Sequence, residues 1–525
     1  MKRIPEIDTP RDPSRRRLMK GAVSVAALAT VPGLPGYVRR ANAATTGELI
    51  AVMFQDPQGL DPQQNIQTES FQAMLACYEQ LYDYDPETDT FFPQVAAEMP
   101  DTTDPLAIRI KLRDGITFHD GSPLTSEDVA YTFNFIIEKG PESPAYGLYS
   151  MVNKVEPVDP LTVIFHMDYP YGLLVNYLSS IMGGIVRKDC RDTVDLKRNP
   201  VGVGCGPFEF VEWVQGSHLT FRKYPGYFRE GLPKLNTLTY KIIKEDATRV
   251  AQLAGGTINF IDEPPKRDYA QLLARDDIDG ARGLSEKVGY VMINHANALM
   301  SNVHLRRALQ YATDGGAILD AVYEGLGVKA HGPMKPGTAW YDPDVEQMAS
   351  YNIERAKEEM AKSGLGTVKI DMRCENNTHH VDSATLLQAL WAQIGVEISV
   401  IPMEKTAFYD YCSLGKPDWT MGYTDWSSSV YTPDYMIKLV YKSDGSYRRS
   451  SYNNPEVDAM IEQAQRSVDA AEQKDLFNRI QLQMAEDVAA IWTCWYDWTP
   501  LWRNEVKGFH VAPTYYDYFD NVSVE

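Results

Sequence analysis

Apolar residues alternate with polar ones in some segments and recur at helical spacing in others, a pattern that predicts an α/β protein. Residues 106–113 (LAIRIKLR) alternate in the way of a half-buried strand. Thr125 and Asp128 then form a capping-box pair that predicts the start of a helix, which Gly140 ends. The further predicted strands are 161–167, 208–214, 219–224 and 238–244, and helices are expected to begin near Ala247, Val303, Ile353, Glu456 and Ala471.

A unit in the last third of the chain predicts where a ligand could bind. Residues 368–374 (VKIDMRC) and 396–403 (VEISVIPM) have the composition of strands, and 382–394 has that of a helix between them. Such a crossover requires parallel strands, and ligands of open α/β sheets bind beyond the carboxyl ends of strands. We therefore expect a polar binding edge at Arg373 and the following loop, 375–380. The apolar residues expected to face inward from the helix are Leu386, Leu390 and Ile394.

The first 43 residues have the features of an export signal. A basic run, 14–20, precedes a weakly apolar stretch, and the small residues 41–43 (ANA) resemble a peptidase site. Paired arginines before a weak apolar region resemble the twin-arginine signal. A Sec-type signal is one alternative, and a membrane anchor is another, although Pro32 and Pro35 interrupt a stretch shorter than the roughly 20 residues that a spanning helix needs. We expect residues 1–43 to be removed and the mature chain to lie in the periplasm.

The charge and the cysteines limit the class of protein. The formal net charge is −20, and residues 1–43 contribute +6, so the mature chain carries −26. Such a chain repels nucleic acid and anionic lipid, so we expect neither as a partner. Six cysteines permit three disulfides in an oxidising compartment, with Cys190–Cys205 favoured as the pair closest in sequence. No Cys-x-x-Cys occurs, so neither a redox dithiol nor a structural zinc site is indicated.

Several long segments resemble one family of transport receptors. Residues 111–133 (KLRDGITFHDGSPLTSEDVAYTF) closely resemble the signature region of the family 5 solute-binding proteins of ABC importers, which include dipeptide, oligopeptide, nickel and glutathione binders. Cys205 departs from the family, which usually has Thr or Asn before this Gly-Pro. The resemblance continues in the family's order through NPVGVGCGPFEFVEW, YFREGLPKLNTLTYKII, TRVAQLAGGTINF, VMINHANALMSNVHLRRALQYATD and YNNPEVDAMI.

The resemblance implies a fold and a domain arrangement. The fold is an α/β, two-lobed periplasmic-binding-protein-like fold of the class II type with an extra inserted domain. The ligand cleft lies between domains I and III, and the chain crosses between the lobes near Lys287 and Pro500. The implied ranges are 44–87, 204–287 and 501–525 for domain I, 88–203 for domain II and 288–500 for domain III.

The resemblance also implies a function. The chain is expected to be the periplasmic substrate-binding component of an ABC importer, a monomer that captures a di- or oligopeptide or a related amino-acid conjugate and delivers it to the inner-membrane permease. No catalysis and no cofactor are expected. The alternatives are a nickel chelate, haem, an opine or an oligosaccharide as ligand, or a twin-arginine-exported enzyme. Against an enzyme, the chain lacks Gly-x-Ser-x-Gly, His-Glu-x-x-His and Cys-x-x-Cys-His.

Two regions resemble ligand-binding segments of the family. In peptide-binding relatives a loop with Trp and Asp pairs a carboxylate with the peptide's α-amino group, and Asp425 with Trp426 resembles it. Ser427 begins a serine run more like that of the glutathione-binding subgroup. Asp425 is alternatively a solvated turn residue. Trp426 is expected to form a cavity wall, because its face can cover a ligand while its N–H finds a partner.

The other region follows the predicted strand 368–374. In dipeptide-binding relatives an Arg near this point binds the ligand carboxylate, and Arg373 lies within about one position of it. A one-residue slip reverses the facing of a strand residue, so Arg373 is alternatively an ordinary strand residue. Asn376 and Asn377 either bind polar ligand groups or form the turn. The adjacent histidines 379–380 (HH) are candidate metal ligands. No Glu-x-x-His or His-x-x-x-His spacing accompanies them, so no metal is expected.

The spacing of four tryptophans near the C-terminus is compatible with a helix or with a strand. In residues 491–502 (IWTCWYDWTPLW) they recur at intervals of 3, 3 and 4, as on a helix. The resemblance implies a strand that returns to domain I, and Pro500 favours the strand. Most of these aromatic residues are expected in the core.

Overall fold

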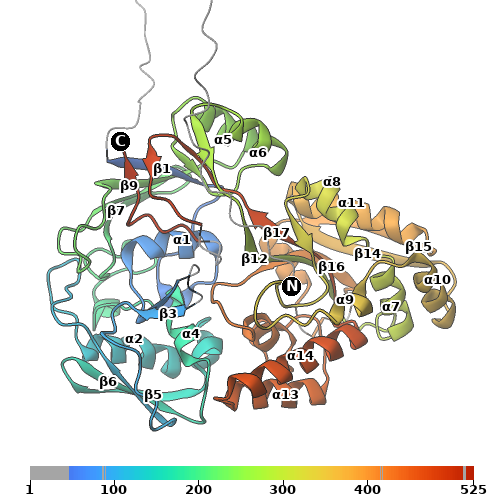
Figure 1. Ribbon diagram of the computed structural model, residues 1–525, viewed down its shortest axis with the longest axis horizontal. Coiled ribbons are helices and arrows are strands. Elements are labelled where there is room, and N and C mark those ends of the chain that lie inside the picture. Colours follow the sequence, from blue (N-terminus) through green and yellow to red (C-terminus); the bar gives the residue numbers. More distant parts are fainter. Residues whose placement is uncertain (1–46, 86–87, 89, 414, 417, 512–515) are drawn as a thin grey trace, which may run out of the picture.

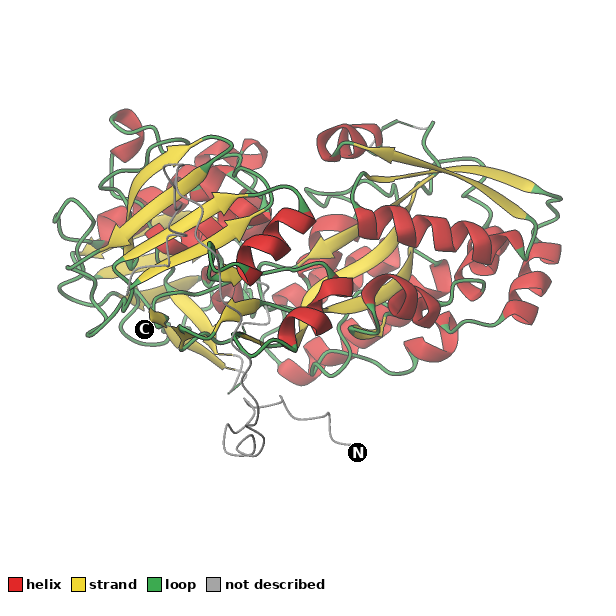
Figure 2. Cartoon of the chain, turned by 90° about the horizontal axis from the view of Figure 1, so that it is seen from above, coloured by secondary structure: helices red, strands yellow, loops and turns green. Residues whose placement is uncertain are grey.

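The structure is a computed structural model that describes residues 47–525 apart from 86–87, 89, 414, 417 and 512–515. The predicted signal peptide lies outside the described residues. Helices and sheets are interleaved along the chain, which confirms the α/β class, and Figures 1 and 2 show two bodies side by side. None of the helices in the described part is long and apolar enough to cross a membrane.

One body holds a four-stranded and a three-stranded sheet, built from segments far apart in sequence (Figure 1). The first has the strand order β1–β9–β8–β7, with β1 parallel to β9. The second has the order β4–β6–β5 and packs against α2 (Ser126–Lys139), which has the predicted capping box and ends at Gly140. The strands are β1 (Glu48–Met53), β4 (Ala107–Lys111), β5 (Val152–Asp159), β6 (Thr162–Met167), β7 (Phe208–Val214), β8 (His218–Lys223) and β9 (Thr237–Ile242).

The other body is built on a six-stranded mixed sheet with the order β13–β17–β12–β16–β14–β15. Its strands are β12 (Gly283–Ile293), β13 (Gly327–Lys329), β14 (Val368–Glu375), β15 (Val396–Met403), β16 (Met421–Ser427) and β17 (Ala490–Trp498). Its helices include α7 (Val303–Tyr311), α8 (Gly315–Tyr323), α10 (Ile353–Lys362), α11 (Thr378–Ala392), α12 (Lys405–Tyr411), α13 (Pro455–Arg466) and α14 (Ala470–Asp487). The predicted starts of α7, α10, α13 and α14 are confirmed to within one residue.

The predicted strand–helix–strand unit is present, but its helix begins earlier than expected. β14 and β15 are parallel along their whole length. The side-chain oxygen of Asn377 accepts the backbone N–H of His380, so Asn377 is the N-cap and α11 starts at Thr378. The prediction of a loop through residue 380 was therefore wrong, because an Asn cap satisfies first-turn N–H groups that the loop would leave open.

The predicted inward face of α11 was also partly wrong. Leu387 and Trp391 are fully buried, whereas Leu386 and Leu390 are only partly so. His380, Leu387 and Trp391 fall at i, i+7 and i+11, one stripe of a helix, and this stripe lies on the sheet. Ile394 is buried as expected.

The tryptophan-rich segment is a strand. All nine residues of β17 are buried, since the strand pairs with β12 and β13 and has packed side chains on both faces. The helical alternative was wrong.

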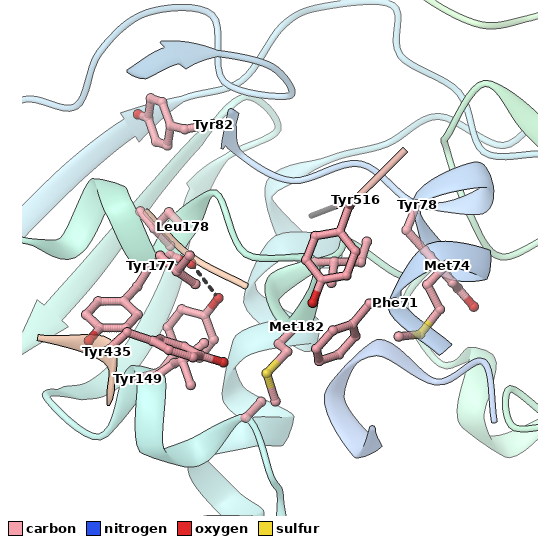
Figure 3. Packing of buried hydrophobic residues seen from close by; sticks show 14 of the residues in the cluster. Phe71, Met74, Tyr78, Tyr82, Tyr149, Tyr177, Leu178, Met182, Tyr435 and Tyr516 are labelled. Carbon is pink, nitrogen blue, oxygen red and sulfur yellow. Dashed lines mark hydrogen bonds between the residues drawn. The ribbon is translucent and has the colours of Figure 1, made fainter. Parts of the chain in front are cut away.

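The two bodies touch directly. The hydroxyls of Tyr171 and Tyr177 donate to the carboxylate of Asp434, each at 2.8 Å. The rings of Tyr84 and Tyr431 stack with centroids 4.3 Å apart. Figure 3 shows Tyr435 from one body beside Tyr149 and Tyr177 from the other. Aromatic side chains therefore fill the junction.

The favoured Cys190–Cys205 disulfide is not formed. All six cysteines lie within the described residues, and all are buried free thiols. Burial raises the pKa of the Cys190 and Cys374 thiols to about 11. Buried in this way, cysteine packs as a small apolar residue and its reactive thiolate is suppressed.

We expect purified protein to show six free thiols. Alkylation in denaturant without reductant should add six labels by intact mass, and the melting temperature should be unchanged by reductant, because no cross-link restrains the unfolded chain. Fewer than six labels without reductant, and six with it, would contradict this assignment.

Candidate functional site

Three strands of the six-stranded sheet bring the predicted site residues to one edge. β16 runs parallel to β14 and antiparallel to β12, so the carboxyl ends of β14 and β16 lie together. Lys287 of β12 lies opposite Ser427 of β16. The pairing of β12 with β17 is irregular between Leu284 and Val288, so the strand bulges next to Lys287.

Strand alternation separates the predicted residues onto the two faces of the sheet. Asp425 and Ser427 lie on the face covered by α8 and α11, because they alternate with Tyr423, which packs in that core. Trp426 lies on the opposite face and packs near Tyr435 and Tyr447, with ring centroids 5.7 and 6.2 Å away. Asp425 and Trp426 are adjacent in sequence but face different surroundings.

Arg373 lies on the Trp426 face. Its neighbours Met372 and Cys374 are buried on the α11 side, so Arg373 points the other way. Its guanidinium lies 4.6 Å from the ring centroid of Tyr411, and its Nη2 donates to the Tyr411 hydroxyl at 3.4 Å. The structure therefore does not bring Asp425 and Arg373 onto one face.

Asp425 is held by three donors rather than standing in a solvated turn. Its Oδ2 accepts the Tyr496 hydroxyl at 2.6 Å, lies 3.1 Å from Nε2 of His380 and lies 3.5 Å from Nζ of Lys287. Burial opposes ionisation, but the Lys287 ammonium and the His380 hydrogen bond outweigh it and hold the pKa of Asp425 well below its ordinary value. The carboxylate is therefore charged.

Asn377 supports Asp425 through His380. The Asn377 amide nitrogen lies 2.9 Å from Nδ1 of His380, and the ring's Nε2 is directed at Asp425. If the amide donates to Nδ1, the ring proton belongs on Nε2, where it is donated to the carboxylate. Asn377 thus caps α11 and orients His380, while Asn376 is exposed at the edge.

Lys287 connects Asp425 to the other body. Its Nζ lies 3.6 Å from Glu263, and Glu263 lies 3.9 Å from Lys266. Both residues follow β10 (Phe260–Ile261), which packs beside β1 in the other body, and Lys266 begins α6 (Lys266–Leu273). Lys266 is buried and donates to the Asp497 carbonyl oxygen at 2.8 Å. Burial disfavours the Lys287 ammonium, but Asp425 and Glu263 outweigh burial and raise its pKa. Lys266, Glu263, Lys287 and Asp425 therefore form a row of alternating charges that joins the two bodies.

Sequence reasoning missed these partners. Lys287 was expected only as a hinge residue and His380 only as part of the polar loop 375–380, whereas Glu263 and Tyr496 were not expected in the site. The one available signal was a lysine directly before the apolar run 288–293 (VGYVMI), because a buried lysine needs a carboxylate partner.

The opposite face has its own polar groups. Glu375 accepts the Tyr409 hydroxyl at 3.0 Å, and the Arg449 guanidinium lies 4.7 Å from the Tyr409 ring centroid. Within the described part of the chain, three buried atoms at this edge have no hydrogen-bond partner. They are Nε of Arg373 and Nε1 of Trp426 on this face, and Oγ of Ser427 on the face covered by α11. Among the residues that the structure describes, no group of three or more His, Cys, Asp and Glu is arranged to hold a metal.

Replacing Asp425 by Asn should destabilise the fold. The variant keeps the side-chain size but leaves Lys287 without its nearest carboxylate, so we expect the free energy of unfolding at pH 7 to fall by about 3 kcal/mol. The folded pKa is depressed, so this stabilisation is present above about pH 4 and is lost as the pH falls through the lower folded value. Urea denaturation at several pH values measures both effects.

Asp371→Asn is the matched control, because its carboxylate lies on the same sheet and its side chain is 57% exposed. It should change the free energy by less than about 0.5 kcal/mol. Equal losses in the two variants would show that Asp425 has no special partner.

The chain is similar to known transport receptors. A family model described as "Bacterial extracellular solute-binding proteins, family 5 Middle" matches residues 90–448. The oligopeptide-binding protein AppA of Bacillus subtilis is 27% identical over 410 residues, 73% of this chain and 74% of the relative. The glutathione-binding protein GsiB of Pectobacterium atrosepticum is 25% identical over 464 residues, 86% of this chain and 90% of the relative.

Solved structures have the same fold. The dipeptide binding protein of Pseudoalteromonas sp. SM9913, in complex with Met-Leu, has a TM-score of 0.83 at 19% identity, over 91% of this chain and all of that one. At this identity the likeness concerns the fold.

Proposed function

This chain belongs to the bacterial extracellular solute-binding proteins, family 5, and we propose that its ligand is a di- or oligopeptide or a related amino-acid conjugate. Members of the family are solute-binding proteins, and the relatives described above include peptide- and glutathione-binding receptors. The ligand would bind between domains I and III and would pass to an inner-membrane ABC permease. The receptor would act as a monomer, without chemistry on the ligand, after twin-arginine export to the periplasm.

One observation carries the proposal for the site. Arg373, Trp426 and Ser427 each keep a buried polar atom without a hydrogen-bond partner among the described residues, at the edge where two parallel strands end. Buried polar groups are nearly always hydrogen-bonded, so three unsatisfied ones toward the same ends of two paired strands suit a ligand as the missing partner. The Arg and Trp groups are donors, and Ser can be either. The backbone carbonyls and carboxylate of a peptide supply the acceptors.

The other predicted site residues have different parts in the proposal. Asn376, exposed at the edge, would contact polar ligand groups. Asn377 would orient His380 beside Asp425 and would not itself meet the ligand. Asp425 would act as the anionic wall of the site.

Ligand capture is testable with purified protein. Native mass spectrometry should find a peptide-sized mass that denaturation releases unchanged, and unfolding should be delayed by a peptide panel. At a hundred times Kd the stabilisation is about 2.7 kcal/mol. A retained mass belonging to a nickel chelate, haem, an opine or an oligosaccharide, or turnover of the bound compound, would reject the peptide proposal.

Trp426→Phe should weaken binding without unfolding the protein. The variant keeps the aromatic face but lacks the indole N–H, so we expect Kd to rise about tenfold, the equivalent of about 1.4 kcal/mol for one lost hydrogen bond. Isothermal titration measures the change. Trp213→Phe is the control, because the indole of Trp213 already donates to Asp56 in the other body at 2.9 Å. Unchanged Kd in Trp426→Phe would place the ligand elsewhere.

A further inference from the structure

Lys287 lies among carboxylates from both bodies. Its ammonium is 3.5 Å from Asp425 and 3.6 Å from Glu263, which belong to different bodies. Glu375 and Glu69 are farther away but close enough to act on the charge of Lys287 or to be acted on by it. Lys287 is therefore the cation nearest to Asp425 in a junction that is rich in negative charge.

These carboxylates would otherwise attract a cation. Two opposite charges this close attract far more strongly in a partly buried site than in bulk water, because the effective dielectric constant is lower there. The side chain of Lys287 is 17% exposed and that of Asp425 is 22% exposed, so water screens this pair only weakly. A ligand ammonium would have to compete with Lys287 for the same oxygen.

That oxygen is already crowded. Tyr496, His380 and Lys287 all approach Oδ2 of Asp425. A ligand ammonium that displaced Lys287 would leave a lysine buried with one carboxylate fewer, and an incompletely paired buried charge is strongly unfavourable. The ring of Tyr496, 5.4 Å from the ammonium, stabilises the lysine further in its present position.

We propose that Lys287 is a built-in counter-ion that determines ligand specificity: it occupies the cation position beside Asp425, so the receptor selects ligands whose group at this edge is not cationic. The inference rests on the proposed function and deepens it. The preferred peptides have a blocked amino terminus or present an internal segment here. A free α-ammonium is disfavoured at this edge.

Matched peptide pairs test this selectivity. Each pair has one sequence with a free amino terminus and the same sequence N-acetylated, and Kd is measured by isothermal titration. Wild type should bind the acetylated member at least as tightly as the free one. Lys287→Met should shift the ratio of the two Kd values at least tenfold toward the free amine, because the carboxylate then lacks its internal cation.

Two variants serve as controls. Lys287→Arg keeps the charge and should leave the ratio within about twofold of wild type. Lys369→Met removes a cation from an exposed pair with Glu397 on the same sheet. It should also leave the ratio of the two Kd values within about twofold of wild type. A wild-type preference for the free amine of tenfold or more, or an unchanged ratio in Lys287→Met, would overturn the inference while leaving peptide binding intact. Binding of no peptide by any variant would reject the proposed function and the inference together.

A double-mutant cycle keeps the proposal testable if Lys287→Met is unstable. Asp425→Asn and Lys287→Met are combined, and the urea midpoints of the ligand-free proteins are compared. The urea midpoint of the double variant should fall by less than the sum of the decreases in the two single variants, because each single change leaves a charge without its partner. Additive losses would overturn the pairing on which the inference depends.

Discussion

The pairing of β12 with β16 and β17 is the constraint on which the rest of the site depends. β12 lies in the middle of the six-stranded sheet, and Lys287 near its start is drawn into the junction between the bodies. A lysine there keeps its charge only if carboxylates compensate the loss of water. Asp425 from β16 and Glu263 from the other body supply them. The strand pairing therefore brings with it a set of charged contacts that joins the two bodies.

The same pairing explains why the adjacent residues Asp425 and Trp426 contact different groups. Side chains of β16 alternate, so Asp425 must face α11 if Trp426 faces the aromatic side chains of the opposite surface. The charged contacts and the unsatisfied donors of Trp426 and Arg373 consequently lie on different sides of one sheet. A ligand bound at this edge, as proposed, would meet both, because both strands end there.

Much of the fold could be predicted from local patterns. Alternation identified β4, β7 and β15, and capping residues identified the start and end of α2. The start of α11 was missed because Asn377 serves equally well as a turn residue and as a cap, and local sequence does not distinguish the two. The disulfide was a guess from proximity in sequence, whereas each cysteine is buried as a small apolar side chain.

The site could be predicted by residue type but not by partner. Asp425 was expected to pair with the α-amino group of a ligand, whereas its cationic neighbour in the structure is Lys287, which comes from a segment 138 residues away. The residues that contact Asp425 come from β12, α11 and β17, and only the folded sheet brings these elements together. The facing of Arg373 depended on the register of β14, which a single sequence leaves open by one residue.

The two junctions between the bodies are built from different chemistry, and this difference bears on the free energy that separating the bodies would cost. At one, Asp434 is fully buried and accepts hydrogen bonds from Tyr171 and Tyr177 of the other body. Gln465 and the buried Lys438 of its own body remain beside it. If the bodies separate, water can replace each phenol, and the net change for each hydrogen bond is small. At the other, separation would part Lys287 from Glu263, but Lys287 keeps Asp425 within its own sheet. Neither junction would then strand a buried charge if the bodies separated, so under the proposed function a ligand that bridges them would set the balance between separated and joined forms.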